Sequence, residues 1–352
     1  MPPMMIRAAL RDLQHRRRRF LVAVIGAGLL LAMSMIMSGL TDSFHNEASR
    51  TVHLAGADRW LVAEGAAGPF TAITMIDDTA VQRVRDTAGV TSASPVLISR
   101  QSVATTGKPM FSILFGAAPG ALGSPQPTEG SPVGKNGEAV VDNRMEVSVG
   151  ESITIAGQPF TVVGRVRSSL LASTHVVYVS LDDARRLSVE GSALSTAVLV
   201  TGEPASAPAG LRSMSPDDAI ADAMEPLKAP SGTIAMVRTL LWLVAGLVVG
   251  SVLYVSALER TRDMAVFKAV GTSSRAIAGG LAAQAVVIAA FAAAIGAALA
   301  TLLAPAFPMT VELSPRLYLL LPVVAVAVSL LGSLGGVRRS LVVPPALAFG
   351  AP

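Results

Sequence analysis

The residue types that carry most enzymatic and metal chemistry are sparse in this chain. It has no cysteine, which excludes disulfides, thiolate zinc sites and cysteine nucleophiles. The four histidines are His15, His45, His53 and His175, and only His45 and His53 lie near each other, at a spacing that could place both on one helical face. A metal site would still need a third ligand, so the sequence favours ordinary solvated histidines and predicts no metal site.

The sequence also lacks clear motifs for nucleotide binding and for acid–base catalysis. No Gly-x-x-x-x-Gly-Lys-Ser/Thr phosphate loop occurs, so the chain is not expected to bind ATP by that route or to be an enzyme. The acidic pairs Asp77-Asp78, Asp182-Asp183 and Asp217-Asp218 fall at expected helix starts, where the positive end of the helix dipole favours carboxylates. Helix capping explains these pairs better than catalysis does, and no cofactor is predicted.

The composition indicates a membrane protein. The chain is 51% hydrophobic and only 15% charged, against about a quarter charged in average soluble proteins. The segment 20–40 is an uncharged run of 21 residues, long enough to cross a hydrocarbon core of about 30 Å. Three further apolar windows give four predicted spans. A cleaved signal peptide is the weaker alternative for 20–40, because 19 residues precede it and no clear cleavage site follows.

The basic residues predict the orientation of these spans. Residues 1–19, 257–275 and the tail together carry 12 basic and 3 acidic groups, whereas residues 41–235 carry 14 basic and 20 acidic groups. The positive-inside rule therefore places both termini and the 257–275 loop in the cytoplasm and the large insertion outside. With a net charge of +4 and its basic residues on these flanks, the chain is not expected to bind nucleic acid.

The fold class that follows is a membrane α-helical protein with four transmembrane helices and an inserted extracytoplasmic α+β domain. The predicted order is a cytoplasmic basic amphipathic segment (1–19), which would lie against lipid headgroups or act as a plain basic flank, transmembrane helix 1 (20–40), the extracytoplasmic domain (41–235), transmembrane helix 2 (236–258), a cytoplasmic amphipathic helix (259–275), transmembrane helix 3 (277–303), a short external loop (304–316), transmembrane helix 4 (317–336) and a cytoplasmic tail (337–352).

Within the external domain, short β-branched segments dominate. Helices are predicted at Asp77–Thr87 and, after a Ser180 cap, at Leu181–Leu187. Strands are predicted at Thr91–Gln101, Phe111–Phe115, Ala139–Val141, Ser152–Ile155, Phe160–Val166 and Val176–Val179, with a hairpin turn at Ala156–Pro159. The Pro-, Ala- and Ser-rich segment Pro204–Pro230 is expected to return the chain to the second span.

The loop between the second and third spans carries the most specific motif. Its apolar residues Met264, Phe267 and Val270 recur at helical spacing, and Gly271 follows in the position favoured for a left-handed cap. The run Glu-Arg-Thr-Arg-Asp-Met-Ala-Val-Phe-Lys-Ala-Val-Gly-Thr-Ser, residues 259–273, closely resembles the cytoplasmic signature of FtsX-like permeases, usually Glu-Arg-x-Arg-Glu-Ile-Gly-x-Leu-Lys-Ala-Leu-Gly-Ala. Asp263 and Ala265 are mild departures from that signature.

The resemblance extends over the whole chain. The Arg-rich start, the segments 149–155, 160–164 and 177–182, and the terminal Pro-Ala-Leu at 345–347 are similar to their counterparts in MacB-type ABC transporter permeases. The first 65 residues most resemble the DevC exporter subgroup. The resemblance implies that the external domain has the MacB periplasmic-core fold and that the protein is a multi-pass subunit of the bacterial cytoplasmic (plasma) membrane.

The family resemblance also implies partners and a mechanism. Two permease copies, identical or homologous, would pair, and each would dock a separate ATP-binding ABC ATPase whose motion is transmitted to the external domains, a process called mechanotransmission. Carried over to this sequence, the docking and cap positions are Glu259, Arg260, Arg262, Asp263, Met264, Phe267, Lys268 and Gly271. The Gly-x-x-x-Gly spacings Gly246/Gly250 and Gly332/Gly336 predict close helix packing, either between copies or within one chain.

Two functional hypotheses remain open at this point. The first is a permease that exports, or extracts from the outer leaflet, a hydrophobic or amphiphilic cargo such as a lipid, lipoprotein, peptide or drug, with or without a membrane-fusion adaptor. The second is a non-transporting regulator of an extracytoplasmic cell-wall hydrolase, as in FtsX itself. Because no predicted span has a charge at its centre, a proton-coupled carrier is disfavoured.

Overall fold

The computed structural model describes residues 17–71, 74–105, 109–170, 174–259, 266, 271, 273–307 and 309–342. The chain divides into two compact units. One consists of Ser43–Ala229, here called the core domain, and the other consists of the segments before and after it, here called the helical unit.

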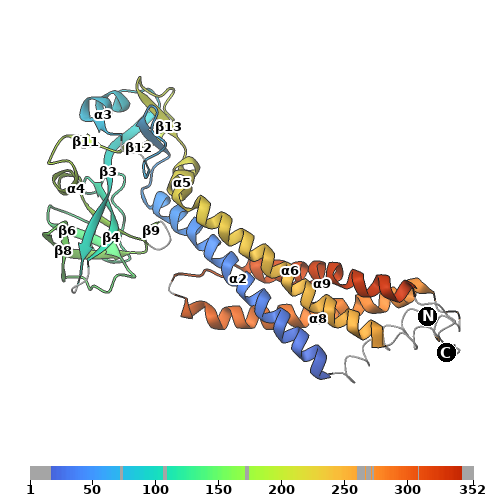
Figure 1. Ribbon diagram of the computed structural model, residues 1–352. Coiled ribbons are helices and arrows are strands. Elements are labelled where there is room, and N and C mark those ends of the chain that lie inside the picture. The colour runs from blue at the N-terminus through green and yellow to red at the C-terminus, as the bar shows by residue number, and fades with distance from the viewer. Residues whose placement is uncertain are drawn as a thin grey trace. The chain divides into compact units, whose positions relative to one another are not determined.

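Four helices in the described residues are long and apolar enough to cross a membrane (Figure 1). They are α2 (Arg17–Leu54), α6 (Lys228–Glu259), α8 (Ser274–Leu303) and α9 (Pro315–Val342), with the 3-10 turn η2 (Ala304–Ala306) after α8. Helix α2 continues well beyond the predicted end at residue 40, because no Gly or Pro interrupts 41–55. Helix α6 likewise begins before residue 236.

Glycines bring the backbones of α6 and α9 into contact in the helical unit. A Cβ atom added to Gly250 would collide with the backbone of Gly332, and one added to Gly332 would collide with the carbonyl of Gly246. A second close approach joins α2 and α8, where Gly296 meets the backbone of Gly28. These small residues allow the tight helix packing that apolar lipid cannot drive by hydrophobic burial alone.

The core domain is built on a mixed sheet, whose hydrogen-bonded order within the described residues is β13-β1-β12-β3-β4-β10-β6-β8-β5. The pairs β4–β10 and β6–β8 are parallel and the other pairs are antiparallel. Its strands are β1 (Arg59–Ala63), β3 (Val90–Ala104), β4 (Pro109–Ala117), β5 (Glu129–Gly130), β6 (Glu138–Asp142), β7 (Ser152–Ile155), β8 (Gln158–Val166), β9 (Ser169–Leu170), β10 (Thr174–Ser180), β12 (Ala197–Gly202) and β13 (Leu211–Met214), while β2 (Ile76–Asp77) and β11 (Leu194–Ser195) pair separately.

The strand β10 lies inside the sheet with both faces covered. Val176 and Tyr178 pack into a core with Trp60 and Phe115, whereas Val177 and Val179 pack into a second core on the opposite face. Because successive side chains of a strand point to opposite faces, a strand buried on both sides reads as a continuous apolar run. The six predicted strands are all present, but β1 and β12 were not predicted.

The predicted helix starts are confirmed. Asp77 caps α3 (Asp78–Arg85), Ser180 caps α4 (Leu181–Ser188), and Ser215 and Asp218 form a capping box on α5 (Pro216–Met224). The return segment predicted at Pro204–Pro230 is therefore not a plain linker: it also contains β13 and the 3-10 turn η1 (Glu225–Leu227). Ala156 and Gly157 both have positive φ, 47° and 81°, as a two-residue hairpin turn requires.

The glycine crossing of α6 and α9 yields a stability prediction. Gly332→Ala should destabilise the helical unit by about 1–3 kcal/mol, because the new methyl group meets backbone atoms that cannot move independently. The matched control is Gly279→Ala, since a Cβ at Gly279 on α8 would meet no atom within 4 Å. Denaturant-induced unfolding of the purified chain in detergent measures both, and equal effects of the two substitutions would contradict the assignment.

Candidate functional site: a polar network at the end of helix α2

The last turns of α2, which belong to the core domain, present a mixed polar and apolar face. Ala48 and Val52 are buried in the core that contains Trp60. Glu47 and Thr51, one helical turn apart, lie beside them and are each only 1% exposed. A buried carboxylate is unfavourable unless it is paired, so the surroundings of Glu47 determine whether this arrangement is stable.

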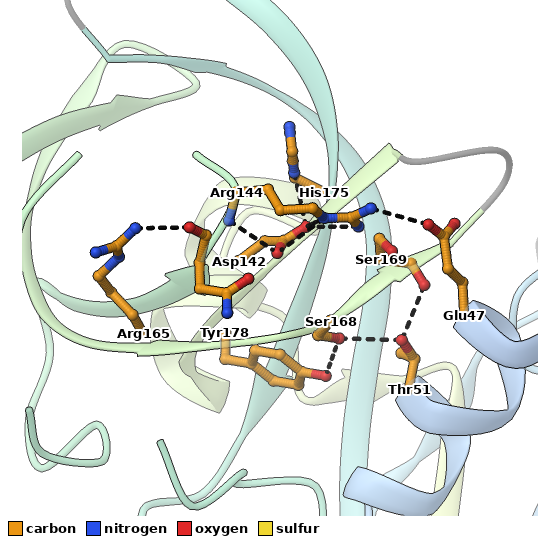
Figure 2. A network of polar contacts seen from close by, with 10 residues as sticks. Glu47, Thr51, Asp142, Arg144, Arg165, Ser168, Ser169, His175 and Tyr178 are labelled. Atoms are coloured by element: carbon orange, nitrogen blue, oxygen red, sulfur yellow. Dashed lines mark hydrogen bonds and ion pairs between the residues drawn. The ribbon is translucent and has the colours of Figure 1, made fainter. Parts of the chain in front are cut away.

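Arg144 provides the partner of Glu47 and links it to the sheet (Figure 2). Its Nη1 lies 2.9 Å from Oε1 of Glu47, and its Nη2 lies 3.0 Å from Oδ2 of Asp142 at the end of β6. The same Asp142 oxygen is 2.7 Å from Nδ1 of His175 on β10. Asp142 is fully buried, whereas the Arg144 side chain is 24% exposed, so the network reaches solvent through Arg144 and His175.

A second branch consists of hydroxyl groups. Thr51 donates its hydroxyl proton to the carbonyl of Ser169 at 3.0 Å, and its oxygen lies 3.0 Å from Oγ of Ser168. Since Thr51 has a single proton, Ser168 must donate to Thr51, and Tyr178 on β10 must donate to Ser168 across 2.7 Å. This directed chain, visible in Figure 2, joins the helix to the same strand that carries His175.

The charges in the network stabilise one another. Burial by itself would raise the pKa of Asp142, but the hydrogen bonds from His175 and Arg144 outweigh burial and lower that pKa below its ordinary value. Burial opposes the charged form of Arg144, yet Asp142 and Glu47 together raise its pKa. Burial also raises the pKa of Tyr178, which therefore keeps the proton that it donates to Ser168.

The geometry of this network fits a role in stabilising the fold and does not fit catalysis. Asp142 and His175 form an acid–histidine pair, but among the described residues no hydroxyl donates to the other ring nitrogen of His175, as a nucleophilic triad would need. His45 and His53 are exposed on α2, and the described residues contain no group of three or more metal-ligating side chains. The arrangement serves to fix the end of α2 to strands β6 and β10.

The sequence-predicted docking positions are only partly visible. Glu259 is the last residue of α6, and Gly271 has φ 91°, the left-handed conformation expected of a cap. Arg260, Arg262, Asp263, Met264, Phe267 and Lys268 lie outside the described residues. Of the predicted packing glycines, Gly246, Gly250 and Gly332 meet within one chain, while Gly336 lies in a part of α9 whose side-chain surroundings are not described.

The polar network was not predicted from the sequence. Glu47 and Arg144 are 97 positions apart, so no local pattern connects them. A usable signal did exist for the helix, because Phe44, Ala48, Val52 and Ala55 recur at helical spacing in a stretch free of Gly and Pro. That spacing would have extended the first helix and placed Glu47 beside a buried face.

Comparison with known proteins identifies the family. A model of the MacB-like periplasmic core domain matches residues 20–217, and a model of the FtsX-like permease C-terminal domain matches residues 235–345. Two uncharacterized ABC transporter permeases of Mycobacterium tuberculosis (strain H37Rv) are 38% and 39% identical over 349 and 350 residues, covering 99% of this chain and 100% of each relative. The chain therefore belongs to the FtsX/MacB family of ABC transporter permeases, membrane proteins of the plasma membrane whose ATPase is a separate subunit.

Two solved structures show a more distant similarity. The periplasmic region of MacB from Actinobacillus actinomycetemcomitans is 12% identical, with a TM-score of 0.35, and covers 47% of this chain and 92% of its own length. The extracellular domain of the noncanonic ABC-type transporter YknZ from Gram-positive bacteria is 14% identical, with a TM-score of 0.33, and covers 42% and 83%. The narrower resemblance to DevC exporters stays a prediction.

The buried ion pair yields a stability prediction with an internal control. Glu47→Gln should destabilise the core domain by about 1–3 kcal/mol, because it removes one of the two carboxylates that pair with Arg144. The control is Glu203→Gln, which removes the exposed Arg59–Glu203 pair and should change stability by less than about 1 kcal/mol. Thermal unfolding of the full-length protein, with hydrogen exchange at residues 43–54, measures both variants. Equal losses of stability would contradict a structural role for the Glu47–Arg144 pair.

The lowered pKa of Asp142 predicts a pH dependence. Because Asp142 binds its proton more weakly in the folded state than in the unfolded state, its contribution to stability is present above about pH 4 and is lost as the pH falls through its folded pKa. Asp142→Asn should remove this part of the slope, so the difference in unfolding midpoint between wild type and variant should shrink on acidification. A constant difference from pH 6 down to about pH 3 would contradict the prediction.

Proposed function

We propose that this permease couples a separate ABC ATPase to its core domain by mechanotransmission, and so exports or extracts a hydrophobic or amphiphilic cargo. The observation that supports this proposal most directly is the network of Glu47, Arg144 and Asp142. Motion of a transmembrane helix moves an external domain only if the end of that helix is held firmly by the domain. Buried, hydrogen-bonded ion pairs provide such an attachment, because they fix both distance and direction.

The form of α2 agrees with this role. It is a single helix of 38 residues, which corresponds to about 57 Å at 1.5 Å per residue, and it contributes residues to both units. An uninterrupted helix transmits a displacement of one end to the other with little internal bending. The two branches of the polar network then pass that displacement to β6 and β10.

The cytoplasmic side of the proposal rests on the sequence. The excess of basic residues at 1–19, 257–275 and the tail supports a topology with both termini in the cytoplasm. The 259–271 region would then face the ATPase, with Glu259 and Lys268 supplying opposite charges for docking. A second permease copy, identical or homologous, would complete a symmetric assembly with two ATPases.

The test is co-purification of the full-length permease with a candidate ABC ATPase, read out as complex formation and ATP turnover. Glu259→Lys combined with Lys268→Glu should abolish the complex, because it reverses the charges that face the ATPase. The matched control is Arg59→Glu combined with Glu203→Arg, which swaps an exposed ion pair of the core domain and should leave the complex intact. Unchanged binding of the first variant would overturn the docking assignment.

The same assay separates docking from coupling. Glu47→Gln, measured below its unfolding midpoint, should bind the ATPase normally but lose the stimulation of ATP turnover by cargo, since the helix is less firmly held by the core domain. Full retention of stimulation would show that the network does not carry the coupling. Direct binding of a cell-wall hydrolase to the core domain, without cargo-stimulated turnover, would favour the regulatory function instead.

A further inference from the structure

An arginine near the start of α6 lies within an otherwise apolar part of the helical unit. The guanidinium of Arg238 stacks over the ring of Trp242, 5.3 Å from its centroid. Its Nη1 donates a long hydrogen bond of 3.4 Å to Oγ of Ser38 on α2. The indole Nε1 of Trp242 donates to Oγ of Ser34, so two serines and a tryptophan hold the arginine in place.

The guanidinium has hydrogen-bonding capacity that the described residues do not use. Its Nε atom is buried and has no hydrogen-bond partner, and no carboxylate of the described residues forms an ion pair with it. A buried N–H without a partner costs about 1–3 kcal/mol, and more on a charged group. The structure therefore presents a cation whose counter-charge is missing from this part of the chain.

An apolar groove adjoins this arginine. It runs between α2, α6 and α9 and is lined by Met35, Trp242, Leu317, Leu320, Leu321 and Val324, together with the two serines. Leu320 is 52% exposed, so the groove opens on the outer surface of the helical unit. In a membrane, that surface faces lipid acyl chains.

The groove and the arginine lie at one end of the helix bundle. Leu317 and Leu320 are in the first turns of α9, and Arg238 is the eleventh of the 32 residues of α6. Ser38 lies four residues before Asp42, where the part of α2 that belongs to the helical unit ends. Glu259 and Ser274 mark the opposite end of α6 and α8. Under the topology proposed above, the groove therefore lies in the outer leaflet.

We propose that this groove is a binding site for an anionic phospholipid of the outer leaflet. The lipid phosphate accepts hydrogen bonds from the terminal Nη groups of Arg238, whose side chain is partly exposed, while Nε stays buried. The groove is shallow, so one acyl chain would lie along its exposed apolar border, which includes Leu319 and Leu320. The charge of the headgroup supplies the counter-ion that the described residues lack, and an arginine at membrane depth is far more stable when so paired.

Lipid binding at this site does not depend on ATPase docking, and it is expected whether the lipid is cargo or a permanent component of the protein. The competing explanation for Arg238 is that it only anchors α6 at the membrane interface through Trp242 and Ser38. An anchoring arginine attracts anionic headgroups no more strongly than any other basic residue at the interface does. The two alternatives therefore differ in a measurable quantity, the share of the preference for phosphatidylglycerol over phosphatidylcholine that depends on Arg238 compared with the share that depends on Arg316.

The experiment is native mass spectrometry of the purified full-length permease, without an ATPase, after exchange with phosphatidylglycerol or phosphatidylcholine. We expect wild type to retain phosphatidylglycerol preferentially and Arg238→Gln to weaken retention roughly tenfold. The matched control is Arg316→Gln, which removes an exposed arginine from the first turn of α9, at the same end of the bundle but outside the groove. It should change retention less than about twofold. Equal losses from both substitutions, or no loss from Arg238→Gln, would overturn the proposal.

A second measurement needs no variant. The chain has only two tryptophans, and Trp60 is fully buried in the core domain, so lipid-borne quenchers should reach Trp242 alone. Phosphatidylglycerol brominated on its acyl chains should quench the fluorescence of wild type at lower mole fraction than brominated phosphatidylcholine does. Identical quenching curves for the two lipids would refute the site even if Arg238→Gln failed to fold.

Discussion

The pairing of the Arg144 guanidinium with the buried carboxylates of Glu47 and Asp142 is the interaction on which the arrangement of the core domain depends. Hydrophobic contacts of Ala48 and Val52 attach the helix to the core, but they are non-directional and tolerate sliding. The ion pairs remove that freedom, because a displaced Glu47 would leave buried charges unpaired. The register of α2 against the sheet is thus set by charge, while the strength of the attachment comes from apolar burial.

Both branches of the network end on one strand. His175 stands near the start of β10 and bonds Asp142, and Tyr178 on the same strand begins the hydroxyl chain to Thr51. The strand is paired with β4 on one side and β6 on the other, and its valines fill both cores. A load applied through α2 therefore enters the sheet at an interior strand, where hydrogen bonds on both edges distribute it, rather than at a weakly held edge.

Hydropathy alone located the four long helices, and β-branched runs located six strands, because both signals are local. The continuation of α2 is not visible in hydropathy, because the composition changes from apolar to polar after residue 40, whereas a helix ends only where its hydrogen bonding is interrupted. Strands β1 and β12 were recoverable in principle: Trp60–Val62 and Ala197–Val200 are short apolar runs next to turn residues. The pairing of Glu47 with Arg144 was not, because it depends on tertiary structure.

Different kinds of interaction stabilise the interior of each unit. The difference bears on the proposed coupling. In the helical unit, Gly246, Gly250 and Gly332 bring backbones together without directional side-chain bonds. Directional bonds in this unit come instead from α6 to α2, where Trp242 and Arg238 donate to Ser34 and Ser38. In the core domain, by contrast, the end of α2 is fixed by buried ion pairs and a directed hydroxyl chain. The end of α2 in the core domain is thus held by charge as well as by packing, which is the kind of attachment that the proposed transmission of ATPase motion needs.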